Sequence, residues 1–186
     1  MNILVTSIIV ILAVIIFFWQ VSNLISIIFG SPTIMMDKKV IVKALRLSGL
    51  KKGDKFYDLG CGNGDVLIEA AKLGAKATGF EISPFYFLLA KVRIFFWRYK
   101  NLRYNSDRAY SVKKGKNKLE IKIYFRNIFK ANLSKADIVY CYLLPKILSK
   151  IKFHKNNRII SVGFPIKSFK PIRTKIIQNH IIFIYR

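Results

Sequence analysis

A glycine-rich turn, followed one strand later by an acid, constrains the fold of this chain more than any other feature. Residues 56–65 read Phe-Tyr-Asp-Leu-Gly-Cys-Gly-Asn-Gly-Asp, and residues 78–84 read Thr-Gly-Phe-Glu-Ile-Ser-Pro. Glycines after an apolar strand let the backbone approach a ligand that any side chain would push away. Glu81 ends the next strand, where it can accept hydrogen bonds from two sugar hydroxyls. The spacing predicts a β-α-β unit that binds a nucleoside.

The positions of the glycines indicate which nucleoside is bound. Dinucleotide folds use Gly-x-Gly-x-x-Gly and turn a helix N-terminus toward a pyrophosphate. Here the glycines are residues 60, 62 and 64, and the third dinucleotide position is Asp65, which would repel a pyrophosphate. Acids at positions 58, 65, 69 and 81 are four of only nine in the chain. This concentration favours a cationic ligand such as S-adenosylmethionine over the alternative of an Asp that only caps a tight turn.

These residues resemble the class I S-adenosylmethionine-dependent methyltransferases, whose first motif is typically an acid, an apolar residue and Gly-x-Gly-x-Gly. The chain is similar, more narrowly, to the small lysine methyltransferases. That group includes an archaeal broad-specificity enzyme and the membrane-tethered mitochondrial enzymes that modify ATP synthase subunit c and the adenine nucleotide translocase. The resemblance runs from about Pro32 to Phe164 and rests on Ser31-Pro32-Thr33, residues 57–65, residues 79–84 and Tyr142-Leu143-Leu144-Pro145.

The resemblance implies roles for individual residues around the cofactor. Asp58 would help to fix the methionine end, Glu81 would hold the ribose, and Ile82 would pack on the adenine. The sequence departs from the family at Asn127, where an acid often contacts the adenine amino group, and at Asn63, which replaces a frequent acid. The implied cofactor-binding set is Asp58, Gly60, Cys61, Gly62, Gly64, Glu81, Ile82, Asn127 and Ile128.

Tyr142 is the predicted catalytic residue. Ligands of open parallel sheets lie beyond the carboxyl ends of the strands, and Tyr142 leaves a predicted strand at that edge. A lysine acceptor must be neutral, against a free pKa of about 10.4, so an apolar lip and an aromatic hydroxyl suit the reaction. The alternative is a tyrosine at the edge of the core with its hydroxyl in water. Methyl transfer from a sulfonium needs no metal, and the spacing of Cys61, Cys141, His154 and His180 is unlike a metal site.

The N-terminal segment predicts a membrane anchor. The first charged residue is Asp37, and the apolar stretch Ile3–Phe29 would span about 40 Å as a helix, more than the ~30 Å hydrocarbon thickness. A signal peptide is the alternative, but no Lys or Arg precedes the apolar run and no convincing cleavage site follows it. We expect a transmembrane anchor over 1–30, a linker over 31–36 and one methyltransferase domain over 37–186.

The flanks of this segment predict its orientation. Basic residues follow the apolar stretch closely, and the domain is therefore expected on the cytoplasmic side of a single-pass protein. Cys61 and Cys141 would stay reduced there. The bases in question are Lys38, Lys39, Lys43, Arg46, Lys51 and Lys52.

Apolar periodicity predicts the order of helices and strands. Alternation of the two predicts an α/β, Rossmann-like, doubly wound, mostly parallel sheet, and the resemblance implies an antiparallel last strand. Helices are predicted over Asp37–Leu47, Asp65–Leu73 and Pro84–Tyr99. Strands are predicted over Lys55–Leu59, Lys76–Glu81, Ile121–Phe125, Asp137–Leu143 and Arg158–Val162, with a closing hairpin of Thr174–Ile177 and Ile181–Tyr185.

A formal charge of +24 indicates an anionic partner. The basic segment 98–118 is predicted to be a flexible loop that presses on an anionic leaflet, with a plain solvated loop as the alternative. Lys91–Tyr104 mixes bases with aromatic residues, which suits lipid headgroups or exposed nucleic acid bases. Because a tether already holds the domain at a membrane, lipid is favoured over nucleic acid.

Three functions therefore compete. The first is a membrane-anchored methyltransferase that modifies a lysine side chain of a membrane or membrane-associated protein. The second is a methyltransferase for RNA or for a lipid-soluble small molecule. The third is a non-catalytic membrane scaffold with a reduced cofactor-binding domain.

Overall fold

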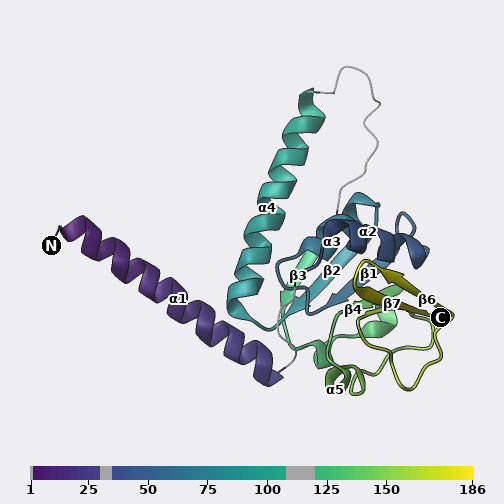
Figure 1. Cartoon of the computed structure of the whole chain (residues 1–186). Helices are drawn as coiled ribbons and strands as arrows, with labels where there is room; N and C mark the ends of the chain where they lie inside the picture. The colour runs from purple at the N-terminus through teal and green to yellow at the C-terminus, as the bar shows by residue number, and fades with distance from the viewer. Residues whose placement is uncertain (1, 30–34, 108–119) are drawn as a thin grey trace.

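A mostly parallel sheet forms the centre of the computed structural model, which describes residues 2–29, 35–107 and 120–186 (Figure 1). Within these ranges the sheet has seven strands in the order β3-β2-β1-β4-β5-β7-β6. The first five are parallel, β7 runs antiparallel to β5, and β6 runs antiparallel to β7. The predicted fold class is confirmed. The strands are β1 (Lys55–Leu59), β2 (Lys76–Glu81), β3 (Ile121–Phe125), β4 (Ile138–Cys141), β5 (Arg158–Val162), β6 (Arg173–Ile177) and β7 (His180–Tyr185).

Helices cover the two faces of the sheet unequally. One face carries α2 (Lys38–Leu47), α3 (Asp65–Lys72) and the buried side of α4 (Pro84–Asp107). The other face is covered by the short elements η1 (Ile128–Lys130), η2 (Leu133–Lys135) and α5 (Pro145–Leu148), together with the loop around Ile166. The first helix, α1 (Ile3–Phe29), projects away from the sheet (Figure 1).

Strand β1 positions the turn that follows it. Successive side chains of a strand point to opposite faces, so Phe56 packs among the helices of one face and Leu59 packs in the cluster on the other. Asp58 lies on the same face as Phe56 and is paired in register with Gly79 of β2 and Tyr140 of β4. The acid of the first motif is therefore at the centre of the sheet.

Gly79 lets the glycine turn and α3 close over β2. A Cβ atom at this position would lie 2.6 Å from Leu67 Cδ1 and 2.7 Å from Cys61 Sγ. Both distances are too short for any side chain, so glycine is required for close packing rather than for a special backbone angle.

The structure differs from the sequence predictions mainly at the ends of elements. Helix α4 continues to Asp107, so the first ten residues of the basic segment 98–118 are helical, which makes the predicted loop wrong there. No Gly or Pro occurs between Pro84 and Gly115 to end the helix earlier. Residues 108–119, most of the predicted linker and Ser31-Pro32-Thr33 lie outside the described residues. Strand β4 is shorter than predicted because Pro145 starts the short helix α5 nearby.

Helix α1 is joined to the domain at the start of α4. Ser22 of α1 is fully buried, and its Oγ lies 2.6 Å from Ser83 Oγ. The backbone N–H of Phe85 donates to Ser22 Oγ over 2.9 Å, and the rings of Phe18 and Phe85 meet edge to face. The first N–H groups of a helix have no partner within the helix, so a serine from α1 caps α4 from outside.

Candidate functional site

The carboxylate of Glu81 ties the glycine turn to the loop after β2. Its Oε2 accepts the backbone N–H of Gly62 at 2.8 Å, and its Oε1 accepts those of Ile82 at 2.9 Å and Ser83 at 2.8 Å. A carboxylate has about four acceptor positions, so about one is left for a hydroxyl of a ligand. Burial raises the pKa of Glu81, and the three N–H donors act in the opposite direction.

Asp58 is a second buried acid at the same turn. The residue is only 2% exposed, and its Oδ2 has no hydrogen-bond partner among the described residues. Burial raises the pKa of Asp58 well above its ordinary range, and the nearby charge of Glu81 raises it further. No described Lys, Arg or His forms a salt bridge with either acid. A cationic ligand would offset the burial of the Asp58 charge and its repulsion by Glu81.

The other two acids of the predicted cluster are already paired. Asp65 lies 2.6 Å from Arg93 of α4 and also accepts a hydrogen bond from Asn63, while Glu69 lies 2.7 Å from Lys72. The inference of a cationic ligand from four acids therefore reduces to Asp58 and Glu81. Asn63 is part of the turn, because its own oxygen accepts the N–H of Asp65.

The three glycines of the turn all have left-handed backbone angles. Their φ values are 81° at Gly60, 51° at Gly62 and 81° at Gly64, where other residues are strained. A Cβ at Gly64 would also lie 3.3 Å from Ala90 Cβ of α4. The turn is closed by the N–H groups of Gly60 and Cys61, which both donate to the Phe80 carbonyl. These bonds hold the backbone of the turn against β2.

Cys61 differs from the other predicted cofactor-binding residues. Its thiol lies against Gly79 in the core beneath the turn, and burial raises its pKa well above the ordinary range. A buried neutral thiol offers little to a ligand, so any role of Cys61 toward the cofactor belongs to its backbone.

The residues predicted to contact the adenine also lie at the carboxyl ends of the parallel strands. Glu81 is paired in register with Phe125 at the end of β3, which brings the half-buried Ile82 and Asn127 to neighbouring strand ends. Ile128 is buried in the core cluster of the other face. Asn127 caps η1, because its side-chain oxygen accepts the N–H of Phe129 at 3.0 Å. The amide nitrogen of Asn127 can only donate, so Asn127 has less capacity than a carboxylate to accept a hydrogen bond from a ligand.

Tyr142 lies at this edge on the face that also carries Asp58. It follows β4 directly, is half-buried, and packs against the core cluster of that face. Its ring meets His180 edge to face at 5.9 Å, and a Cβ at Gly163 would lie 3.2 Å from its Cε2. Sequence reasoning missed His180, which the antiparallel course of β7 carries to the carboxyl ends of the parallel strands.

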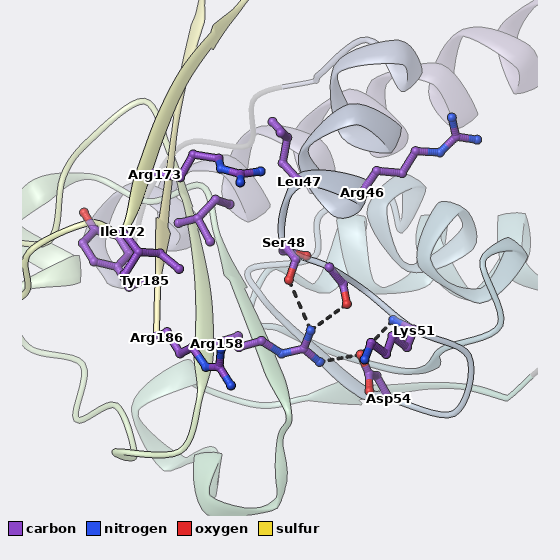
Figure 2. A pocket seen from close by; sticks show the side chains of 12 residues that line it. Arg46, Leu47, Ser48, Lys51, Asp54, Arg158, Ile172, Arg173, Tyr185 and Arg186 are labelled. Carbon is purple, nitrogen blue, oxygen red and sulfur yellow. Dashed lines mark hydrogen bonds and ion pairs between the residues drawn. The ribbon is translucent and has the colours of Figure 1, made fainter.

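A basic hollow lies at the other end of the parallel strands, beside their amino ends (Figure 2). It has a volume of about 650 Å³ and is lined in part by Arg46, Arg158 and Arg173. The guanidinium of Arg158 donates to the carbonyls of Ser48 and Gly49 and pairs with Asp54 at 2.5 Å. This arginine locks the α2–β1 connection onto β5, far from the glycine turn. Among the described residues, no three His, Cys, Asp or Glu side chains form a cluster that could hold a metal ion.

Comparison with protein families gives one match to the described site. The model of the ANTKMT methyltransferase domain matches residues 58–173, which begin at the acid of the first motif and include the glycine turn, Glu81 and Tyr142.

Comparison with known proteins gives methyltransferases of three substrate classes. A protein-lysine N-methyltransferase of Saccharolobus islandicus is 28% identical over 168 residues, which are 83% of this chain and 92% of the relative. The crystal structure of an RNA methyltransferase from Salinibacter ruber in complex with S-adenosyl-L-homocysteine is 25% identical, with a TM-score of 0.63 over 82% of this chain and 92% of that chain. A probable cobalt-precorrin-6B C(15)-methyltransferase of Methanosarcina mazei is 43% identical over only 53 residues, 28% of this chain and 27% of the relative. The S-adenosyl-L-homocysteine in the Salinibacter ruber complex and the match to a methyltransferase family support S-adenosylmethionine as the cofactor.

Replacement of Glu81 by Gln should weaken cofactor binding. The amide group would face one of the N–H donors that the carboxylate now accepts, and the charge-assisted bond to a ribose hydroxyl would be lost. We expect the Kd for S-adenosylmethionine to rise roughly 10- to 100-fold by calorimetric titration of the detergent-solubilised protein. Glu120→Gln removes the same charge from an acid paired with Lys122 and should leave the Kd unchanged. An unchanged Kd in Glu81→Gln would exclude this carboxylate from the cofactor site.

Replacement of Asp58 by Asn should stabilise the cofactor-free protein at neutral pH. A carboxyl with a raised pKa is more easily protonated in the folded chain than in the unfolded chain, so its ionised form destabilises the fold above the folded pKa. The gain in melting temperature should be present at pH 8 and shrink as the pH falls toward the ordinary carboxyl pKa of about 3.9.

Asp37→Asn is the matched control for this experiment. The N–H of Lys39 lowers the pKa of Asp37, so loss of that charge should not raise the melting temperature at pH 8. Thermal unfolding with and without S-adenosylmethionine would measure both variants. A melting temperature for Asp58→Asn that is lower at every pH would contradict the prediction.

Proposed function

We propose that this chain, which belongs to the ANTKMT methyltransferase domain family, transfers methyl groups to a lysine side chain of a membrane or membrane-associated protein. The chain is an S-adenosylmethionine-dependent methyltransferase with a class I fold. The observation that carries the proposal is the position of Tyr142 on the same face as Asp58 at the carboxyl edge of the sheet. The protein-lysine N-methyltransferase that aligns over most of both chains supports it.

The cofactor supplies an activated methyl group, and the chain's residues align it with the acceptor. In this proposal Asp58 and the turn glycines hold the methionine end, while Glu81 holds the ribose. Ile82, Asn127 and Ile128 would contact the adenine. In-line displacement at the methyl carbon requires alignment and exclusion of water, which buried backbone and apolar groups at this edge provide.

The lysine acceptor must lose its proton before it attacks the methyl group. An apolar lip lowers the pKa of an amine because it removes water from the charged form. Leu143 is buried and Leu144 is partly exposed directly after Tyr142, so the lip combines apolar side chains with one hydroxyl. We propose that the Tyr142 hydroxyl accepts a hydrogen bond from the neutral amine and directs its lone pair toward the methyl carbon.

The proposed domain organisation is a transmembrane anchor over 1–30, a linker over 31–36 and the methyltransferase domain over 37–186. Helix α1 contains a 23-residue segment, Ile3–Ile25, that is long and apolar enough to cross a membrane, and most of its large apolar side chains are exposed. The basic residues after it support a single-pass protein with its catalytic domain on the cytoplasmic side.

RNA is a second candidate acceptor, because the Salinibacter ruber structure is that of an RNA methyltransferase. The formal charge of +24 also suits a nucleic acid. The two candidates differ in where transferred methyl groups are found, so one labelling experiment can separate them.

Purified full-length protein with radiolabelled S-adenosylmethionine should label a protein in membranes from cells that lack this enzyme. We expect label that resists nuclease and organic extraction, and mass spectrometry should place one to three added methyl groups on a lysine. Asp58→Ala is the inactive control. Nuclease-sensitive label would establish RNA as the acceptor, and label that enters organic solvent would establish a lipid-soluble molecule. Either result would reject the lysine proposal.

Replacement of Tyr142 by Phe tests the acceptor side separately. Phenylalanine keeps the ring contacts with His180 and Gly163 and removes only the hydroxyl. We expect kcat with the labelled acceptor to fall roughly 10-fold, the equivalent of one hydrogen bond in the transition state, while KM for S-adenosylmethionine stays the same. Tyr124→Phe, on the edge strand β3, is the control. If kcat is unchanged in Tyr142→Phe, the hydroxyl has no part in orienting the amine.

A further inference from the structure

Helix α4 has a row of exposed apolar side chains on the side opposite the sheet. Between 44% and 64% of the surface of each of these residues is exposed, although all are large and apolar or aromatic. We refer to them as the α4 ridge: Leu88, Val92, Phe95, Phe96 and Tyr99.

Helical spacing places the ridge on one side of α4. At about 100° per residue, positions 88, 92, 95 and 99 fall within an arc of about 60°. Phe96 lies about 40° outside this arc, where it also lines a shallow hollow with Lys72 of α3. The opposite side of the helix carries Ala90 and Ile94, which are buried against the domain. Helix α4 is therefore apolar on two sides. The domain covers one side, and the large apolar residues of the other are exposed in the part of the chain that the structure describes.

Basic residues border the ridge on both sides. Lys91 is exposed on one side, where its Nζ lies 5.4 Å from the centre of the Phe87 ring, and Lys100 is exposed on the other. An apolar stripe with lysines at its margins is typical of a helix that lies in the headgroup region of a bilayer.

The contact between α1 and α4 sets the depth at which α4 begins. Ser22, which binds Ser83 and Phe85, lies three residues before the end of the membrane-length segment Ile3–Ile25. At 1.5 Å per residue this is about 4.5 Å along the helix axis. If α1 spans the bilayer, the first turn of α4 is therefore level with the headgroups.

If α1 spans a bilayer, the directions of the two helices turn the side of α4 that carries the ridge toward the membrane. Figure 1 shows α1 and α4 leaving their contact in different directions, with the sheet on the far side of α4 from the N-terminus of α1. The side of α4 that faces away from the sheet thus faces the region through which α1 passes.

From these observations we infer that the α4 ridge lies in the headgroup region of the cytoplasmic leaflet and holds the cofactor edge of the sheet at the membrane surface. The inference rests on the proposed anchoring by α1 and extends it to a second point of contact. Because α4 begins directly after the loop of Glu81, the acceptor lysine belongs to a protein segment at the bilayer surface rather than one that extends far into the cytoplasm.

Spin-label accessibility in proteoliposomes tests the inference on the full chain. Single cysteines at Leu88 and Phe95 would carry the label, since the native Cys61 and Cys141 are buried. The vesicles would contain equal amounts of phosphatidylcholine and phosphatidylglycerol. Ile15→Cys in α1 reports the anchor, and Lys155→Cys at the amino edge of the sheet reports the aqueous phase. Cofactor binding by each labelled variant would verify its fold.

We expect the labels at Leu88 and Phe95 to be accessible to oxygen and shielded from a water-soluble nickel chelate, as a label at Ile15 should be. A label at Lys155 should show the reverse. Ridge labels that behave like Lys155, with Ile15 still in lipid, would overturn the inference and leave the anchor intact. An aqueous Ile15 would overturn the anchor as well. Ridge labels shielded from both reagents, with spin–spin broadening, would identify a second copy of the chain as the occupant and would also overturn it.

Discussion

The carboxylate of Glu81, which is buried and accepts three backbone N–H groups, is the interaction on which the rest of the site depends. It joins the turn after β1 to the loop after β2, which are separated in sequence by the whole of α3. The same loop contains Ser83, which is bound to Ser22 of α1. The glycine turn, α4 and α1 are therefore all connected to residues 81–85. The hydrogen bonds that link α1 and the start of α4 to Glu81 are all shorter than 3 Å, so a displacement of either helix would be transmitted to Glu81.

In the proposed function, the position of the two acids favours cofactor binding at the expense of stability. A parallel strand is buried on both faces, so an ionised Asp58 at its centre has an unsatisfied oxygen and a carboxylate neighbour. A hydrophobic residue there would stabilise the empty fold. The ligand that gains most from the arrangement carries positive charge beside groups that hydrogen-bond, as S-adenosylmethionine does. Asp65 stabilises the fold instead, because its salt bridge with Arg93 fixes α4 against the turn. Its charge is already paired and is not directed at a ligand.

The sequence could predict the parts of the site that depend on local geometry. Strands β1, β2, β3 and β5 have the predicted bounds, and the turn glycines have the positive φ that their pattern requires. It could not predict contacts made by folding. Arg93 reaches Asp65 across 28 positions, Ser22 reaches Ser83 across 61, and His180 meets Tyr142 only because β7 runs antiparallel. The two members of each pair belong to different elements, so the residue pattern of one helix or strand cannot reveal the contact.

Helix α4 shows why periodicity alone could not assign its aromatic residues. The sequence interpretation assigned the aromatic residues of Lys91–Tyr104 to lipid headgroups or to exposed nucleic acid bases. In the structure Phe95 is exposed, whereas Tyr86, one turn before that stretch, is buried against the domain. A helix that is apolar on opposite sides has no single hydrophobic direction, so its pattern resembles that of a helix buried all round. Only the structure distinguishes the two kinds of helix, because it shows that the domain covers one side of α4 and that exposed lysines border the other. A helix between a protein core and a bilayer satisfies both sides with one sequence, and the cofactor loop at its start is then held at a fixed distance from the membrane.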